Sequence, residues 1–168
     1  MRTRIHSILI TLCLLLLLAQ SALAVGTVVF ASVEKYPANN PTMVIISYTC
    51  TSDASAGTLP AKDILVSEVG FNYWQQGFYL LNAKAVNPAA NYPTGAQTLS
   101  LTDSDGAQLI GSTAGDTLTL STSASVSAVL SSSRAPAQRG IEKLLTIGAV
   151  ASSIGNSKVF TYKLILGK

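Results

Sequence analysis

The sequence predicts an all-β protein, built as a single antiparallel β-sandwich of about seven to nine short strands. Apolar and polar residues alternate with period two along most of the chain after residue 24, which is typical of strands with one buried face. Turn-forming residues recur roughly every 8 to 12 positions, and no strong helical segment lies between the strands. A small closed β-barrel fits the same periodicity and remains the alternative.

The alternation predicts the position of each strand along the chain. Residues 27–34 form the first strand, which ends at a segment with two prolines and two asparagines. Residues 42–51 form a clearer one, whose pattern places Tyr48 and Cys50 on the inward face. Residues 123–133 suit either a strand or a turn of helix. The remaining strands are expected at residues 64–69, 77–86, 97–102, 107–110, 117–121, 141–150 and 158–166.

A tight hairpin is predicted at Asp105-Gly106, between the strands at 97–102 and 107–110. The surrounding Asp-Ser-Asp-Gly run superficially resembles a calcium loop. With Gly106 at the sixth loop position, Leu101 and Ser112 occupy the first and twelfth positions, where carboxylates are needed. The calcium match fails, so we interpret the run as a turn.

Residues 1–24 have the order of a secretory signal peptide. A basic start precedes an apolar block at 8–19, and a small-residue site ends at Ala24, the predicted cleavage position. The apolar block is shorter than the roughly 18 to 20 residues that span a bilayer. We therefore expect an exported protein (secreted, periplasmic or on the cell surface), a single domain at 25–168, and no stable membrane insertion after processing.

The composition of residues 25–168 excludes several function classes. Cleavage removes Arg2 and Arg4, which leaves nine Lys and Arg against eight Asp and Glu, so no nucleic-acid partner is expected. The single histidine, His6, is also lost, and with it Ser-His-Asp, Cys-His and histidine–zinc chemistry. Cys50 alone remains, so no intrachain disulfide forms. We expect no cofactor and no metal.

The aromatic segment, residues 71–79, is the main candidate for function. Nine residues hold five of the eleven aromatic side chains and the only tryptophan. Amphipathic rings beside amides are typical of surfaces that bind glycans or proteins, although large rings in small β domains more often fill the core. The predicted binding residues are Phe71, Tyr73, Trp74, Phe78 and Tyr79.

Paired carboxylates are the remaining route to an enzyme, and Asp63 and Glu68 are the nearest candidates. Their spacing of five places them on no defined common face. A small secreted hydrolase would need one of them to titrate far above its ordinary pKa. We therefore expect the protein not to be an enzyme.

Three stretches resemble small bacteriophage and prophage proteins of β-sandwich type. Residues 42–54 contain Tyr-Thr-Cys-Thr-Ser-Asp-Ala, and residues 87–111 run from a proline loop through an alternating strand and an Asp-x-Asp-Gly turn to a glycine. Residues 141–166 hold two strands around a Ser/Ala/Gly/Asn loop. The resemblance implies a virion structural protein, such as a capsid decoration or appendage component, and carries over no functional residue.

The leading hypothesis is an exported, non-enzymatic structural or interaction module. It acts through an exposed aromatic surface, or through a strand edge such as 158–166 that pairs with another chain. A protein or glycan partner and self-assembly both fit this hypothesis. The phage-type virion protein is the alternative, and a carboxylate hydrolase is the third reading.

Overall fold

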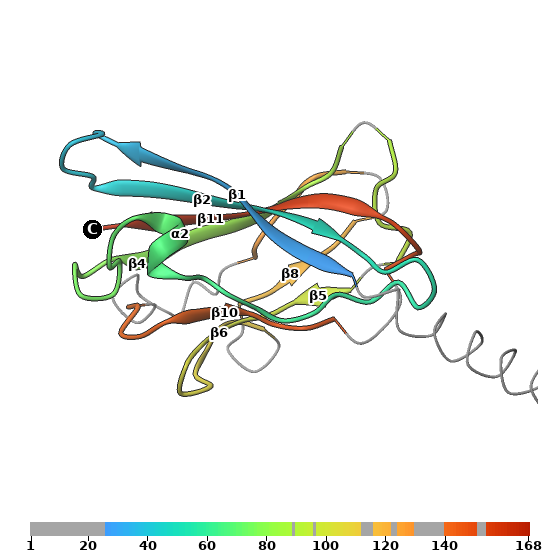
Figure 1. The fold of residues 1–168 in the computed structure, drawn as a ribbon. Helices are drawn as coiled ribbons and strands as arrows, with labels where there is room; N and C mark the ends of the chain where they lie inside the picture. The colour runs from blue at the N-terminus through green and yellow to red at the C-terminus, as the bar shows by residue number, and fades with distance from the viewer. Residues whose placement is uncertain are drawn as a thin grey trace, which may run out of the picture.

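The computed structural model describes residues 26–88, 90–95, 97–111, 116–121, 124–129, 140–150 and 154–168. These residues form an antiparallel β-sandwich in which two layers of strands enclose a hydrophobic core (Figure 1). The predicted sandwich is confirmed. The barrel alternative is wrong, because each described sheet has two distinct ends and does not close on itself. The predicted signal peptide and its cleavage site at Ala24 lie outside the described residues.

The first layer is a five-stranded sheet in the order β1-β2-β11-β4-β9. Its strands are β1 (Thr27–Tyr36), β2 (Met43–Thr51), β4 (Tyr79–Val86), β9 (Val126–Ser127) and β11 (Val159–Gly167). The last strand in the chain therefore lies in the middle of the sheet, paired on both sides. The prediction that residues 158–166 form a free edge is wrong, because β2 and β4 occupy both hydrogen-bonding sides of β11.

The second layer contains a four-stranded sheet and a separate pair. The sheet has the order β3-β10-β6-β7, and the pair joins β5 to β8. Their bounds are β3 (Lys62–Asp63), β5 (Thr98–Leu99), β6 (Leu101–Asp103), β7 (Gln108–Ile110), β8 (Leu118–Thr119) and β10 (Leu145–Ile147). The predicted strand at 97–102 is thus divided at Ser100, whose carbonyl accepts a hydrogen bond from the Gly148 N–H at 3.0 Å.

The predicted strand at 64–69 is wrong. After β3, the Ile64 N–H still donates to the Leu145 carbonyl of β10, and the chain then turns into helix α2 (Val66–Val69). Gly70 ends this single turn in the left-handed conformation, with φ of 77° and its N–H donating to the Val66 carbonyl. A glycine adopts this conformation without a steric penalty, so one turn of helix replaces the alternating strand.

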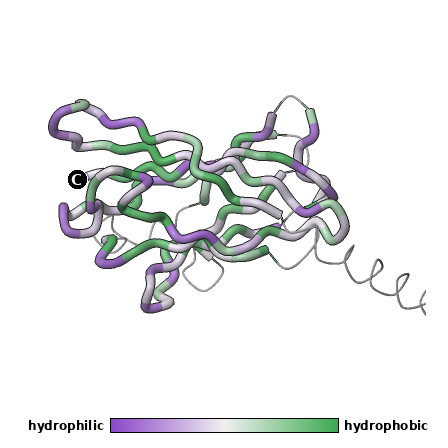
Figure 2. Tube along the Cα trace, in the orientation of Figure 1, coloured by the Kyte–Doolittle hydropathy of each residue, from purple (hydrophilic) through white to green (hydrophobic). Residues whose placement is uncertain are grey.

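The core side of the five-stranded sheet follows the predicted alternation. On β2 the inward side chains are Val44, Ile46, Tyr48 and Cys50, all buried, so the inward position of Cys50 is confirmed. Burial raises the pKa of the Cys50 thiol to about 12, which keeps it protonated and unreactive. Figure 2 shows hydrophobic residues along the strands and hydrophilic residues gathered in many of the connecting turns.

The predicted hairpin at Asp105-Gly106 is confirmed between β6 and β7. Gly106 has a φ of 81°. The carboxylate of Asp103 accepts hydrogen bonds from the backbone N–H groups of Asp105 and Ala107, at 3.0 and 2.9 Å. Its oxygen atom therefore organises the turn itself, as aspartate commonly does in such loops.

Strand β1 is a long edge of the five-stranded sheet. Ala31 is an extra residue at a bulge between Phe30 and Ser32, and Glu34 and Lys35 follow before Pro37. Bulges, charged side chains and prolines are the features by which natural edges avoid pairing with other chains. Pairing through the backbone of β1 is therefore disfavoured, although its side chains remain accessible on the sheet face.

Candidate functional site

The aromatic segment connects helix α2 to β4 through a compact turn. The Phe78 N–H donates to the Tyr73 carbonyl at 3.3 Å, and the Gln75 N–H donates to the Asn72 side chain at 3.2 Å. Gly77 has a φ of 72°, and a Cβ there would meet no atom within 4 Å. The turn therefore needs glycine for its backbone conformation rather than for space.

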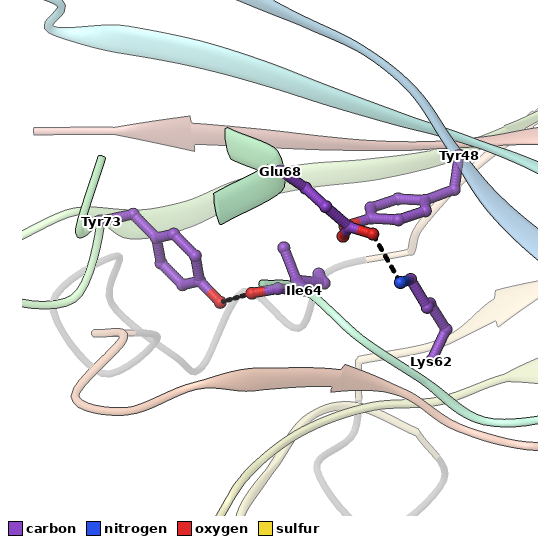
Figure 3. A network of polar contacts seen from close by, with 5 residues as sticks. All are labelled: Tyr48, Lys62, Ile64, Glu68 and Tyr73. Atoms are coloured by element: carbon purple, nitrogen blue, oxygen red, sulfur yellow. Dashed lines mark hydrogen bonds and ion pairs between the residues drawn. The ribbon is translucent and has the colours of Figure 1, made fainter. Parts of the chain in front are cut away.

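Two of the five rings are buried, which corrects the expectation of a five-ring exposed surface. Tyr73 and Phe78 are 0% and 1% exposed. The Tyr73 hydroxyl donates to the Ile64 carbonyl at 3.0 Å (Figure 3). It also accepts from the Leu145 N–H at 3.0 Å, so it joins the segment before α2 to β10. Burial raises the pKa of Tyr73 to about 12. These two rings are part of the core.

Phe71 is partly buried and also has a structural environment. Its ring lies 5.6 Å from that of Phe78, centroid to centroid, and the Lys35 ammonium of β1 lies 4.6 Å from the Phe71 ring centroid. A cation above an aromatic face is an attractive contact. Through its contact with Lys35, Phe71 links the aromatic segment to β1.

Trp74 and Tyr79 are half-buried and line an open cavity of about 510 Å³. We call this cavity the aromatic groove; its lining residues are Trp74, Gly77, Phe78, Tyr79, Gly140, Ile141 and Glu142. The buried Phe78 and Ile141 give it an apolar floor, and the exposed Glu142 supplies a carboxylate. Its volume lies within the range of roughly 300 to 1,000 Å³ that is usual for small-ligand sites.

The two sides of the aromatic groove come from distant parts of the chain. Tyr79 forms an isolated antiparallel bridge with Gly140, and the Ile141 N–H donates to the Phe78 carbonyl at 3.2 Å. The C-terminal Lys168 lies beside it, with its ammonium 5.0 Å from the Phe78 ring centroid. A positive and a negative side chain therefore accompany the two rings.

Three of the residues that the sequence predicted for binding, Trp74, Phe78 and Tyr79, line the groove, whereas residues 140–142 and Lys168 were not among the predicted residues. Nothing in the local pattern of Gly140, Ile141 and Glu142 distinguishes them from any strand start. Their role depends on long-range pairing with residues 78 and 79, which the sequence pattern does not encode.

The two carboxylates considered for hydrolysis are held separately. Glu68 extends from α2 and accepts hydrogen bonds from the Lys62 ammonium at 2.6 Å and the Tyr48 hydroxyl at 2.9 Å (Figure 3). Asp63 instead accepts from the Thr146 hydroxyl at 2.7 Å. Burial alone would raise the pKa of Glu68, but the hydrogen bonds from Lys62 and Tyr48 outweigh it and lower the pKa. A general acid requires the opposite shift.

A third carboxylate, Asp53, is buried in a loop of its own. One oxygen accepts from the N–H groups of Ser55 and Ala56 at 2.7 and 2.5 Å, and the other accepts from the Thr58 hydroxyl at 2.6 Å. The hydrogen bonds from Thr58 and Ala56 lower the pKa of Asp53 strongly. The carboxylate is saturated by its own loop, which indicates a structural role.

The chain matches no protein-family model, no curated protein and no solved structure. The resemblance to phage proteins therefore stays a prediction. Within the described ranges, no three acidic, cysteine or histidine side chains are grouped as a metal site would need. No described helix has the length and hydropathy to cross a membrane.

Proposed function

We propose that this protein is an exported, non-enzymatic interaction module that binds a surface glycan in the aromatic groove. The observation that carries the proposal is the pair of half-buried amphipathic rings, Trp74 and Tyr79, on an open cavity with an apolar floor. Sugar rings present an apolar face that packs on aromatic rings and hydroxyls that need polar partners. Glu142 provides such a partner in the groove, and Lys168 provides one beside it.

The dimensions of the groove favour a compact ligand over an extended protein surface. Protein interfaces of standard size bury about 800 Å² on each partner, with 20 to 30 residues a side. The groove is lined by seven residues and is concave, which suits one or two sugar units. The mixed charge of Glu142 and Lys168 also disfavours a polyanionic ligand.

The proposal is tested by titrating the purified protein with a panel of soluble oligosaccharides in a calorimeter. We expect Trp74→Ala to weaken the binding of any hit by about tenfold or more, because central aromatic anchors dominate binding energy. Phe71→Ala is the matched control, since Phe71 is a partly buried ring of the same segment that does not line the groove.

Thermal midpoints of both variants separate a binding role from a folding role. Weaker binding by Trp74→Ala, with a midpoint no lower than that of Phe71→Ala, supports the site. Equal loss of binding in both variants, or no oligosaccharide binding by the wild type, would contradict the proposal.

Export is tested separately by mass spectrometry of the N-terminal peptide, on extracellular material divided by density into particles and soluble protein. A soluble or surface-bound chain that begins at Val25 supports export by cleavage after Ala24. Particle-bound protein that still begins at Met1 would contradict the signal peptide and favour the virion alternative.

A further inference from the structure

The side of the five-stranded sheet that faces away from the core presents a patterned surface, which we call the outer face. It consists of the outward side chains of β1, β2, β11 and β4. Strand register arranges these side chains in rows across the sheet. The lysine row is Ser32, Ser47, Lys163 and Lys84; the isoleucine row is Glu34, Ile45, Ile165 and Asn82; and the methionine row is Tyr36, Met43, Gly167 and Tyr79, with the bulged Leu81 beside it.

The isoleucine row and the methionine row form an accessible apolar surface at one end of the sheet. Tyr36 is 46% and Leu81 is 37% exposed, and Met43, Ile45 and Ile165 are partly exposed. Leu81 is the extra residue at a β-bulge, and its side chain extends over Gly167, where a Cβ would lie 2.6 Å from a Leu81 methyl group. Contiguous apolar side chains on an otherwise polar surface commonly mark an interaction site.

The lysine row carries two like charges that no described residue compensates. Lys84 of β4 and Lys163 of β11 are directly opposite each other. Neither forms an ion pair within the described part of the chain. Like charges directly opposite on neighbouring strands are destabilising. A partner that brings a carboxylate to this row would relieve the repulsion.

We propose that the outer face packs against the outer face of a second copy of this chain, about a two-fold axis that runs along the strands between β2 and β11. Such an axis places β1 over β4 and β2 over β11 of the second copy, with the rows in step. Ile45 then faces Ile165, and Tyr36 faces Tyr79 and the bulged Leu81 beside it. Glu34 comes to lie over Asn82, one row from the Lys84 of the second copy.

The row pattern selects this axis over the perpendicular one. An axis across the strands, through the middle of the sheet, would place the lysine rows of the two copies face to face. Lys84 would then face Lys84 of the second copy, and Lys163 would face Lys163. The axis along the strands instead places Lys84 over Ser32 and Lys163 over Ser47 of the second copy. It also brings Glu34 of each copy close to Lys84 of the other. One arrangement therefore covers the two apolar rows and brings a carboxylate near Lys84, and it resembles aligned sheet packing.

The first test is sedimentation velocity of the full chain, expressed in a secreting host and purified, over a wide range of concentrations. We expect a reversible dimer. Leu81→Glu places a carboxylate in the apolar contact, beside the Glu34 of the second copy, and should weaken the dimer by about tenfold or more, since like charges brought together at an interface oppose association. Leu65→Glu is the matched control, because Leu65 is 40% exposed at the start of α2, away from the outer face.

The second test is a charge exchange. Glu34→Lys and Lys84→Glu should each weaken the dimer by about tenfold, and the double variant should recover to within about threefold of the wild type. Circular dichroism confirms that every variant is folded. A wild type that stays monomeric at all concentrations, equal effects of Leu81→Glu and Leu65→Glu, or a double variant no tighter than the single ones would overturn the proposal. None of the substituted residues lines the aromatic groove, so failure of the dimer proposal leaves the glycan proposal standing.

Discussion

Tyr73 and Tyr79 carry the same side chain six positions apart, yet the structure uses them differently. Tyr73 is fully buried, and its hydroxyl joins the Ile64 carbonyl to the Leu145 N–H. Tyr79 is half-buried and lines the aromatic groove, and among the described residues its hydroxyl has a single long contact of 3.5 Å, to the Lys168 carbonyl. The difference shows that one dense aromatic segment serves two purposes, with one group of rings in the core and another at the surface.

Among the aromatic residues of this segment, we expect Phe78→Ala to cause the largest loss of stability. Phe78 is 1% exposed and packs against Phe71, so its loss leaves a cavity in the core. We expect the free energy of unfolding to fall by about 3 to 5 kcal/mol, measured by denaturant titration. A fall below about 1 kcal/mol would mean that Phe78 belongs with the surface rings.

Tyr73→Phe should have the next largest effect, because it removes only the hydroxyl. The Ile64 carbonyl and the Leu145 N–H would lose this partner in a buried place. We expect a loss of about 1 to 3 kcal/mol, the usual cost of buried polar groups without partners. Hydrogen exchange should rise at the Leu145 amide. Unchanged protection of that amide would show that the bridge from Tyr73 is dispensable.

The contrast between these rings also shows where sequence reasoning succeeds. Period-two alternation predicts residues 42–51 and 158–166 to within about one residue of β2 and β11, and it predicts the inward side of Cys50. Alternation reports which face of a strand is buried, which is a local property. It does not report the neighbour of a strand, so the central place of β11 was missed.

In the candidate site, too, the local sequence pattern predicts some features and long-range contacts decide the others. The density of rings at residues 71–79 is visible in the sequence, but their separation into core and groove is not. That separation depends on β10, which reaches the Tyr73 hydroxyl through Leu145, and on Gly140, which bridges to Tyr79. Both contacts span more than 60 residues of chain. The helix at Val66–Val69 was missed because a single turn is too short for its own periodicity.

Acidification should lower the free energy of unfolding by a smaller amount through Glu68, whose carboxylate links α2 to Tyr48 of β2 and to Lys62. The folded pKa of Glu68 is lowered, so its contribution is present above the ordinary value of 4.5 and is lost as the pH falls through the folded pKa. Glu68→Gln should cost about 0.5 to 1 kcal/mol at neutral pH, as ion pairs with solvent access do. Its unfolding free energy should then fall less than that of the wild type on acidification below about pH 4.5.

The control for this measurement is present in both proteins. Asp53 also has a lowered pKa, and it makes stability fall with acid in the wild type and in the variant alike. The difference between the two pH profiles therefore isolates Glu68. Parallel profiles would mean that the hydrogen bonds from Lys62 and Tyr48 contribute nothing to folding.

Tyr79→Phe should have the smallest effect on stability and is the sharpest test of the comparison. The substitution is identical to Tyr73→Phe and lies in the same segment, but no buried group in the described part of the chain is bonded to the Tyr79 hydroxyl. We expect a change in unfolding free energy within about 0.5 kcal/mol. If Tyr79→Phe destabilised the protein as much as Tyr73→Phe, both tyrosines would belong to the core, and the aromatic groove would retain Trp74 as its one amphipathic ring.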